Sequence, residues 1–314
     1  MQKRSTKYLT SSNTDILHAA KLLDAGELVS FPTETVYGLG ADARNSTAVA
    51  QVFQAKGRPH FNPLIVHVSS TDAAETYVEW SGTARILAEA FWPGPMTLVM
   101  PLKVGHGLSP LVTSGLSTLA IRVPAHPTAQ SLLAAFGGPV AAPSANPSGR
   151  ISPTTAAHVK AGLGGRISAI LDDGPCDVGV ESTIVGLQPV PTLLREGGVT
   201  REEIEAVLGY SLKNPADSAV LTAPGQMSSH YAPKASVRLN ATDANPGEVL
   251  LGFGNVKGDL NLSPSGDLAQ AAARLFDYLH QMDAADQLIA IAPIPDVGLG
   301  RAINDRLKRA AAPR

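Results

Sequence analysis

Apolar side chains along this chain change repeatedly between a helical and a strand-like spacing from residue 13 to about residue 210. Residues 14–25 place apolar side chains on one helical face and stop at Gly26, after which ELVSF (27–31) has the short apolar pattern of a strand. This alternation is typical of a layered α/β or α+β domain, here residues 1–210, although it does not determine the order of the strands. The same change of period predicts further helices over 46–55, 84–91 and 201–209, and strands over 63–68, 96–102, 118–123, 167–172, 182–187 and 191–196.

Residues 211–236 interrupt this pattern with three prolines and no periodic apolar face, which predicts a linker. Such a linker is either an inert tether or a lid over a binding site. Residues 237–314 return to alternating strand-like and helical segments, with a strongly helical stretch over 268–282 and a basic helix over 300–311. They predict a second, smaller α/β domain.

Composition narrows the class of protein. Apolar residues make up 44% of the chain and charged residues 17%, which excludes wholesale disorder. A net charge of −2 and only 5% aromatic residues argue against a surface that binds RNA by charge and base stacking. The single Cys176 cannot build a disulfide framework. The start of the chain is polar, and no apolar run reaches the roughly 18 residues of a membrane helix. We therefore expect a cytoplasmic protein with no membrane partner.

Several common catalytic signatures are missing from the sequence. There is no phosphate-binding GxxxxGK[ST], no GxGxxG after a strand and no HExxH. Polar loops of small residues remain at the expected strand ends, where α/β sheets bind ligands. The first, over 31–43, carries Thr35, and we expect Gly38 and Gly40 to let its chain turn tightly. The same composition also suits a plain turn.

Lys56 and Arg58 flank a glycine where a predicted helix ends. The helix dipole alone favours cations there. Alternatively, the pair forms a phosphate clamp, with lysine as a point charge and arginine as a two-pronged donor. Asn62 and His67 could add polar contacts. Arg122 lies within an otherwise apolar strand, so its buried charge needs either a protein carboxylate or a ligand carboxylate as a partner, and the sequence leaves both open.

The segment 140–154 contains Ser144, Asn146 and Ser152 among small residues. Small hydroxyls beside backbone amides suit a phosphate or a nucleoside, or else cap a helix that begins near residue 153. Ser182 begins a strand, and Arg195 ends another. Taken together, the loops offer four cations and few catalytic carboxylates. They predict an anion- and nucleotide-binding α/β protein.

In their order along residues 31–198, these loops resemble the YrdC/Sua5 family of L-threonylcarbamoyladenylate synthases. HYAP (230–233) and GLGRAINDRLKRAA (298–311) are similar to the two-domain Sua5 form of that family. The segments that carry the resemblance are PTETVYGLG, the K-x-R of Lys56 and Arg58, NPLIVH, WPGPMT, R-x-P-x-H-P, APSAN, GVEST and LLREG.

This resemblance implies a twisted α/β sheet with a positively lined cleft, a smaller Rossmann-like C-terminal domain, and a linker that covers the cleft. It also implies an enzyme that makes L-threonylcarbamoyl-AMP and pyrophosphate from L-threonine, bicarbonate or CO2, and ATP with Mg²⁺. A separate transferase complex then places the threonylcarbamoyl group on adenosine 37 of tRNA, giving t6A.

Carried onto this sequence, the resemblance implies two groups of ligand-binding residues and a catalytic set. The catalytic set is Lys56, Arg58, Ser144 and Asn146, around the phosphates. Threonine is expected near Thr35, His67, Arg122, Ala142 and Ser182. ATP is expected near Arg58, Asn62, Thr118, Ser144, Ser152, Arg195 and Tyr231.

Two other functions stay open at this point. One is an RNA-binding translation factor that uses the same cleft without catalysis. The other is a carbamoyl transferase that uses carbamoyl phosphate, although this chain lacks the acylphosphatase and zinc-finger parts of such proteins.

Overall fold

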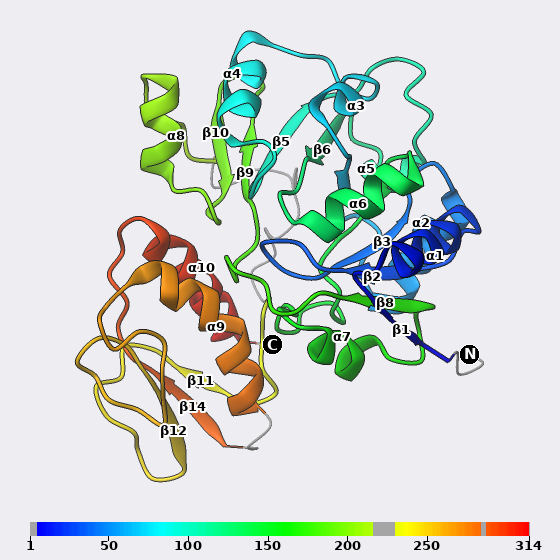
Figure 1. The fold of residues 1–314 in the computed structure, drawn as a ribbon. Helices are drawn as coiled ribbons and strands as arrows, with labels where there is room; N and C mark the ends of the chain where they lie inside the picture. Colours follow the sequence, from blue (N-terminus) through cyan, green and yellow to red (C-terminus); the bar gives the residue numbers. More distant parts are fainter. Residues whose placement is uncertain (1–4, 216–229, 284–286, 314) are drawn as a thin grey trace.

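The computed structural model of the chain describes residues 5–215, 230–283 and 287–313 (Figure 1). Within these residues, ten strands form one mixed sheet in the order β1-β8-β2-β3-β7-β4-β6-β5-β9-β10. Its strands are β1 (Lys7–Thr10), β2 (Val29–Phe31), β3 (Gly38–Asp42), β4 (Ile65–His67), β5 (Met96–Pro101), β6 (Thr118–Arg122), β7 (Val140–Ala141), β8 (Ala169–Asp172), β9 (Thr183–Gly186) and β10 (Thr192–Arg195).

Helices cover both faces of this sheet, which confirms the α/β class expected from the sequence. They are α1 (Asn13–Asp24), α2 (Ser46–Lys56), α3 (Thr71–Glu75), α4 (Gly82–Phe91), α5 (Pro110–Thr113), α6 (Pro127–Phe136), α7 (Ala156–Leu163) and α8 (Arg201–Leu208).

Strand alternation divides the core between the two faces. Ala169 and Leu171 of β8 pack into the cluster under α1 and α6, whereas Ile170 between them joins the larger cluster that includes residues of α2, α4 and α7. Because successive side chains of a strand point to opposite faces, each buried strand serves both clusters. The buried strands therefore read as continuous apolar runs in the sequence.

The segment around Gly38 and Gly40 does not form the tight turn that we expected but the strand β3. β3 pairs antiparallel with β2 on one side and with β7 on the other. A Cβ atom at Gly40 would come within 2.9 Å of a Val140 methyl group, so glycine here allows close packing within the sheet.

The second sheet has four parallel strands in the order β11-β14-β12-β13, in agreement with the expected smaller Rossmann-like part. Its elements are β11 (Val237–Arg238), β12 (Glu248–Gly252), β13 (Leu260–Asn261), β14 (Leu288–Ile291), α9 (Leu268–Asp283) and α10 (Leu299–Ala310). Along the sequence, the segment 211–236 separates the strands of the first sheet from those of the second, and we propose that it is the linker. Residues 216–229 of that segment lie outside the described residues.

The two parts of the chain share a buried contact. Val36, Ile151 and Val180 belong to the first part, yet they pack into the apolar cluster built by α9, α10 and the second sheet. Figure 1 shows α9 and α10 on the side of the second sheet that faces the first part. The second part therefore covers apolar surface that the first part alone would expose to water.

Two histidines stack across this contact. The rings of His158 on α7 and His280 on α9 lie 3.9 Å apart and nearly parallel. Burial lowers the pKa of each imidazole to about 4; for His280 the charge of His158 adds to this effect, and Asp283 and Asp277 oppose it. Both rings are therefore neutral at pH 7, and protonation of either one disfavours the stacked arrangement.

This pair makes stability depend on pH. An unfolded histidine titrates near pH 6.5, so the folded state binds fewer protons than the unfolded state between about pH 6.5 and 4. Stability is complete above that range and falls as the pH drops through it. We expect the unfolding midpoint to fall by about 3 °C or more between pH 7.5 and pH 5. His280→Phe should reduce this fall; an equal fall in this variant and in the unmodified protein would contradict the prediction.

Candidate functional site

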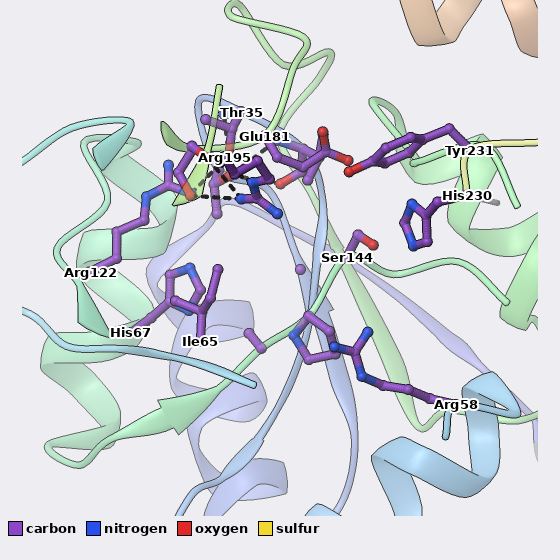
Figure 2. A pocket seen from close by; sticks show the side chains of 16 residues that line it. Thr35, Arg58, Ile65, His67, Arg122, Ser144, Glu181, Arg195, His230 and Tyr231 are labelled. Carbon is purple, nitrogen blue, oxygen red and sulfur yellow. Dashed lines mark hydrogen bonds between the residues drawn. The ribbon is translucent and has the colours of Figure 1, made fainter. Parts of the chain in front are cut away.

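A small cavity lies on the first sheet, where several loops meet residues 230 and 231 (Figure 2). Its volume is about 50 Å³, room for one or two water molecules. Nine of the residues expected from the resemblance line it: Thr35, Arg58, His67, Arg122, Ala142, Ser144, Ser182, Arg195 and Tyr231. The remaining lining residues are Thr33, Val36, Gly38, Ile65, Pro143, Glu181 and His230.

Strand register brings one group of these side chains together. His67 on β4 lies directly opposite Arg122 on the parallel strand β6, and Ile65 lies opposite Ala120. Alternation turns these residues away from the larger apolar cluster, to which their neighbours Val66 and Ile121 belong. The cavity floor is therefore set by strand pairing.

Arg122 is buried and paired with a protein carboxylate. Its Nη2 lies 2.8 Å from Oε1 of Glu34, its Nη1 donates to the Thr35 hydroxyl at 2.9 Å, and its Nε donates to the carbonyl of Gly94 at 3.1 Å. Burial alone would raise the pKa of Glu34, but the charge of Arg122 holds this pKa below its usual value. Of the two partners left open by the sequence, the protein carboxylate is present. One N–H on each terminal nitrogen of Arg122 still has no assigned partner among the described residues.

Two neighbouring groups are suited to reading a small polar ligand. Burial, reinforced by the charge of Arg122, lowers the pKa of His67 to about 3, so its ring is neutral. The Nδ1 atom of His67 is buried and has no hydrogen-bond partner among the described residues. The hydroxyls of Thr33 and Thr35 lie 2.8 Å apart, and Thr33 also donates to the carbonyl of Val36. These bonds fix the Thr35 hydroxyl at the cavity wall.

Arg58 brings a cation to the opposite side of the cavity. The helix α2 ends at Gly57, whose left-handed φ of 61° turns the chain away after Lys56. Arg58 then donates to the carbonyls of Asn62 and Pro63, at 3.2 and 2.8 Å. No carboxylate lies within ion-pair distance of Arg58 among the described residues. Burial and the charge of Arg195 lower the pKa of Arg58 to about 10.

Arg195 reaches the same cavity from β10. A bulge between Leu193 and Arg195 shifts the register of β10 against β9 at this point. The Arg195 guanidinium donates to the carbonyl and hydroxyl of Ser182, at 2.8 to 3.1 Å. Burial lowers the pKa of Arg195 as well. Two buried arginines with depressed pKa values, one of them lowered by the charge of the other, form a site that favours an anion.

Lys56 and Asn146 lie behind the cavity wall rather than in it. The Lys56 ammonium donates to the carbonyls of Ser144 and Asn146, both at 2.5 Å. The Asn146 amide donates to the carbonyls of Pro147 and Arg150. Burial lowers the pKa of Lys56 well below its usual value. These bonds hold the loop that presents Ser144 to the cavity.

Three other expected residues also lie outside the lining. Asn62 supports Arg58 through its carbonyl, and the Ser152 hydroxyl donates to Glu181 at 2.5 Å. Thr118 begins β6 on the same face as Arg122, about 13 Å away at ~3.3 Å per residue. A ligand that contacted both Thr118 and Tyr231 would have to extend well beyond the present cavity.

His230 and Tyr231 close the cavity from the side of the proposed linker. Their rings lie 4.0 Å apart, and Tyr231 is 1% exposed. Burial raises the pKa of Tyr231 to about 12, and its hydroxyl has no hydrogen-bond partner among the described residues. Burial lowers the pKa of His230 to about 3, so this ring is neutral too.

Comparison with known families decides which family the chain belongs to. The model Sua5_yciO_yrdC, described as "Telomere recombination", matches residues 21–197, and the model Sua5_C, described as the C-terminal domain of threonylcarbamoyl-AMP synthase, matches residues 199–312. The chain belongs to the Sua5/YciO/YrdC family. The family resemblance read from the sequence motifs is confirmed.

Two relatives that match this chain over nearly its whole length share the name threonylcarbamoyl-AMP synthase. The threonylcarbamoyl-AMP synthase of Bacillus subtilis is 40% identical over 98% of this chain and 96% of its own length. That of Pyrococcus abyssi is also 40% identical, over 94% of each chain. A crystal structure of P. abyssi Sua5 complexed with L-threonine is 37% identical, covers 98% of each chain and superposes with a TM-score of 0.89.

Sequence reasoning missed the acidic residues of this Sua5-family site. Glu34 and Glu181 both sit in motifs that we quoted, PTET and GVEST, but we expected few functional carboxylates. A single acid among small residues at a strand end was the available signal. Each of these acids is buried and paired with an arginine: Glu34 with Arg122, and Glu181 with Arg306.

Two further observations bear on ligands and membranes. Among the described residues, no group of three or more His, Cys, Asp or Glu side chains could hold a metal ion. No helix in that part of the chain is long and apolar enough to cross a bilayer.

Burial raises the pKa of the Cys176 thiol, which argues against a nucleophilic role for it.

Proposed function

We propose that this chain makes L-threonylcarbamoyl-AMP from L-threonine, bicarbonate or CO2, and ATP, with release of pyrophosphate. The observation that carries the proposal is a cavity with Arg122 and neutral His67 on one side, Arg58 on the other, and Arg195 between them beside Ser182. The name of the full-length relatives supports it, as does the threonine complex of the P. abyssi protein.

The reaction needs positioning more than acid–base chemistry. The threonine amine forms an N–C bond to CO2 and loses a proton, giving a carbamate. A carbamate oxygen then attacks the α-phosphorus of ATP, and the bond from that phosphorus to the bridging oxygen of the β-phosphate breaks. Pyrophosphate leaves with the electron pair. Bringing the reactants together accounts for a large part of such catalysis.

In this proposal, the first side of the cavity binds threonine. The two unassigned N–H groups of Arg122 would hold the carboxylate, while the Thr35 hydroxyl and Nδ1 of His67 would accept from the ammonium or read the side-chain hydroxyl. Ala142 and Ser182 would complete the wall. A neutral imidazole suits this role, because a charged one would repel the ammonium.

The phosphates of ATP would lie against Arg58, Arg195 and Ser144. Both arginines are buried with depressed pKa values, so an anion stabilises their charged forms. Lys56 and Asn146 would act by holding the Ser144 loop. Glu181 in the cavity lining and Glu34 beside Arg122 are both engaged by arginines, so Mg²⁺ would enter with ATP, held mainly by phosphate oxygens.

The cavity has to enlarge before ATP can bind. Sites for ligands of this size measure about 300–1,000 Å³, far more than the 50 Å³ present. His230 and Tyr231 belong to the proposed linker, and their displacement would enlarge the cavity. Return of the linker over bound ligands would exclude water from the labile carbamate.

One assay tests the proposal directly. The protein is incubated with ATP, Mg²⁺, bicarbonate and each amino acid in turn, and the acyl-nucleotide is detected by mass. We expect an acyl-adenylate with threonine, and none when bicarbonate and CO2 are removed. No acyl-nucleotide with any amino acid, together with tight, salt-sensitive RNA binding, would instead favour the RNA-binding translation factor, which the named relatives do not support.

The product has a further destination in this proposal. An acyl-adenylate is a reactive donor, so a transferase must consume it, and we propose the complex that forms t6A on tRNA in the cytoplasm.

A further inference from the structure

Arg306 lies on α10, among apolar residues that build the second core. Its neighbours Ile303 and Leu307 belong to that core, and Arg306 itself is 0% exposed. Arginine is almost never fully buried unless it is paired, because an unpaired charge loses its hydration. The reason for its burial must therefore lie in what it contacts.

Two partners of Arg306 come from the first part of the chain. Its Nε donates to Oε2 of Glu181 at 3.0 Å, and its Nη1 donates to the carbonyl of Glu196 at 2.5 Å. Its Cζ lies 5.6 Å from the centre of the Tyr231 ring, within the range of a cation–π contact. Asp305, on α10 itself, lies 3.2 Å from Nη1 but is more exposed. One side chain of the C-terminal helix thus contacts both a wall residue of the cavity and the residue that closes it.

Glu181 is the buried acid whose negative charge Arg306 compensates. It lines the cavity beside Ser182 and Arg195, and its other oxygen accepts from the Ser152 hydroxyl. Burial alone would raise the pKa of Glu181, but the charges of Arg306 and Arg195 hold it below the usual value. Glu181 is therefore ionised in a cavity where a triphosphate is proposed to bind. An uncompensated carboxylate there would repel the phosphates.

We propose that Arg306 is a positioning residue of the nucleotide site, which cancels the charge of Glu181 and supports the Tyr231 ring from behind. This inference rests on the proposed function, because it assumes that ATP binds in this cavity. It gives α10 a direct part in the affinity for ATP. The affinity for threonine should be insensitive to Arg306, since Arg122 and His67 lie across the cavity from Tyr231 (Figure 2).

Steady-state pyrophosphate release separates the two substrates. ATP is titrated at saturating threonine, and threonine at saturating ATP. We expect Arg306→Gln to raise the KM for ATP about ten-fold or more, with the KM for threonine within about two-fold. Arg306→Lys keeps the charge and should be intermediate. Removing both charges in Arg306→Gln/Glu181→Gln should return the KM for ATP to within about three-fold of Glu181→Gln alone.

Arg301→Gln is the matched control. Arg301 also lies on α10 and also crosses to the first part of the chain, where it pairs with Glu196 and Glu202, but it does not reach the cavity. If these arginines only tether the two parts, both glutamine variants should behave alike. We expect Arg301→Gln to keep both KM values within about two-fold of the unmodified protein.

Three results would overturn the inference: an equal rise in both KM values for Arg306→Gln, the same rise for Arg301→Gln, or no recovery in the double variant. If Arg306→Gln does not fold, Arg306→Lys and the double variant decide the question by the same KM comparison. Failure of the proposed function would look different, because the unmodified protein would then release no threonine-dependent pyrophosphate.

Discussion

Arg122→Ala is expected to lower kcat/KM for threonine in pyrophosphate release by about 10²–10³-fold. Arg122 offers its unassigned N–H groups at the cavity wall and also orients the Thr35 hydroxyl, so its removal takes away two ligand contacts together. The measurement is pyrophosphate release over a threonine titration, with threonine binding followed by calorimetry.

This variant needs a control for folding, because it leaves Glu34 as an unpaired buried carboxylate. Arg122→Ala/Glu34→Gln removes both charges and should unfold at a higher temperature than Arg122→Ala while remaining inactive. Arg44→Ala, which removes an exposed arginine paired with Asp42 outside the cavity, should keep normal activity. Activity regained in the double variant would mean that Arg122 serves stability rather than threonine binding.

The second large effect is expected for Arg58→Ala, at the nucleotide side of the cavity. Arg58 has backbone carbonyls as partners and no carboxylate among the described residues, so its removal leaves no orphaned charge and relieves repulsion with Arg195. We expect kcat/KM for ATP to fall about 10²-fold or more. The unfolding temperature should stay the same or rise, because replacing a residue of a binding site often stabilises a protein while impairing its function.

Threonine binding provides the contrast for Arg58. Calorimetry without nucleotide should give a threonine affinity within about two-fold of the unmodified protein. Arg58→Lys keeps a point charge but loses the two-pronged donor, so it should recover only part of the ATP dependence. An Arg58→Ala protein that lost threonine binding equally, or that kept full activity with ATP, would refute the division of the cavity into two sides.

The elements of the fold were largely predictable because most of them have a clear period. α2 spans Ser46–Lys56 against the predicted 46–55, and β6 spans Thr118–Arg122 against the predicted 118–123. β3 escaped prediction because Gly38 and Gly40 look like turn residues, and the need for glycine there comes from Val140, a hundred positions along the chain. Local pattern does not contain that contact.

The partners within the site were not predictable for the same reason. Glu34 lies in the loop after β2, and Arg122 lies at the end of β6. The two meet because of the order in which the strands pair, and periodicity does not encode that order. Glu181 and Arg306 are 125 positions apart and meet through the contact of two separate sheets. Residue types at strand ends indicated an anion site, whereas charge pairing within it required the three-dimensional structure.

The backbone at Tyr231 adds an energetic consequence. Its φ of 61° is left-handed, a conformation that costs a residue with a side chain about 1–2 kcal/mol. Contacts of the ring with Phe276 and Arg306 offset that cost only while the residue is docked. If the linker moves aside for a nucleotide, as we propose, release of this left-handed backbone would return part of the energy that is needed to break the ring contacts.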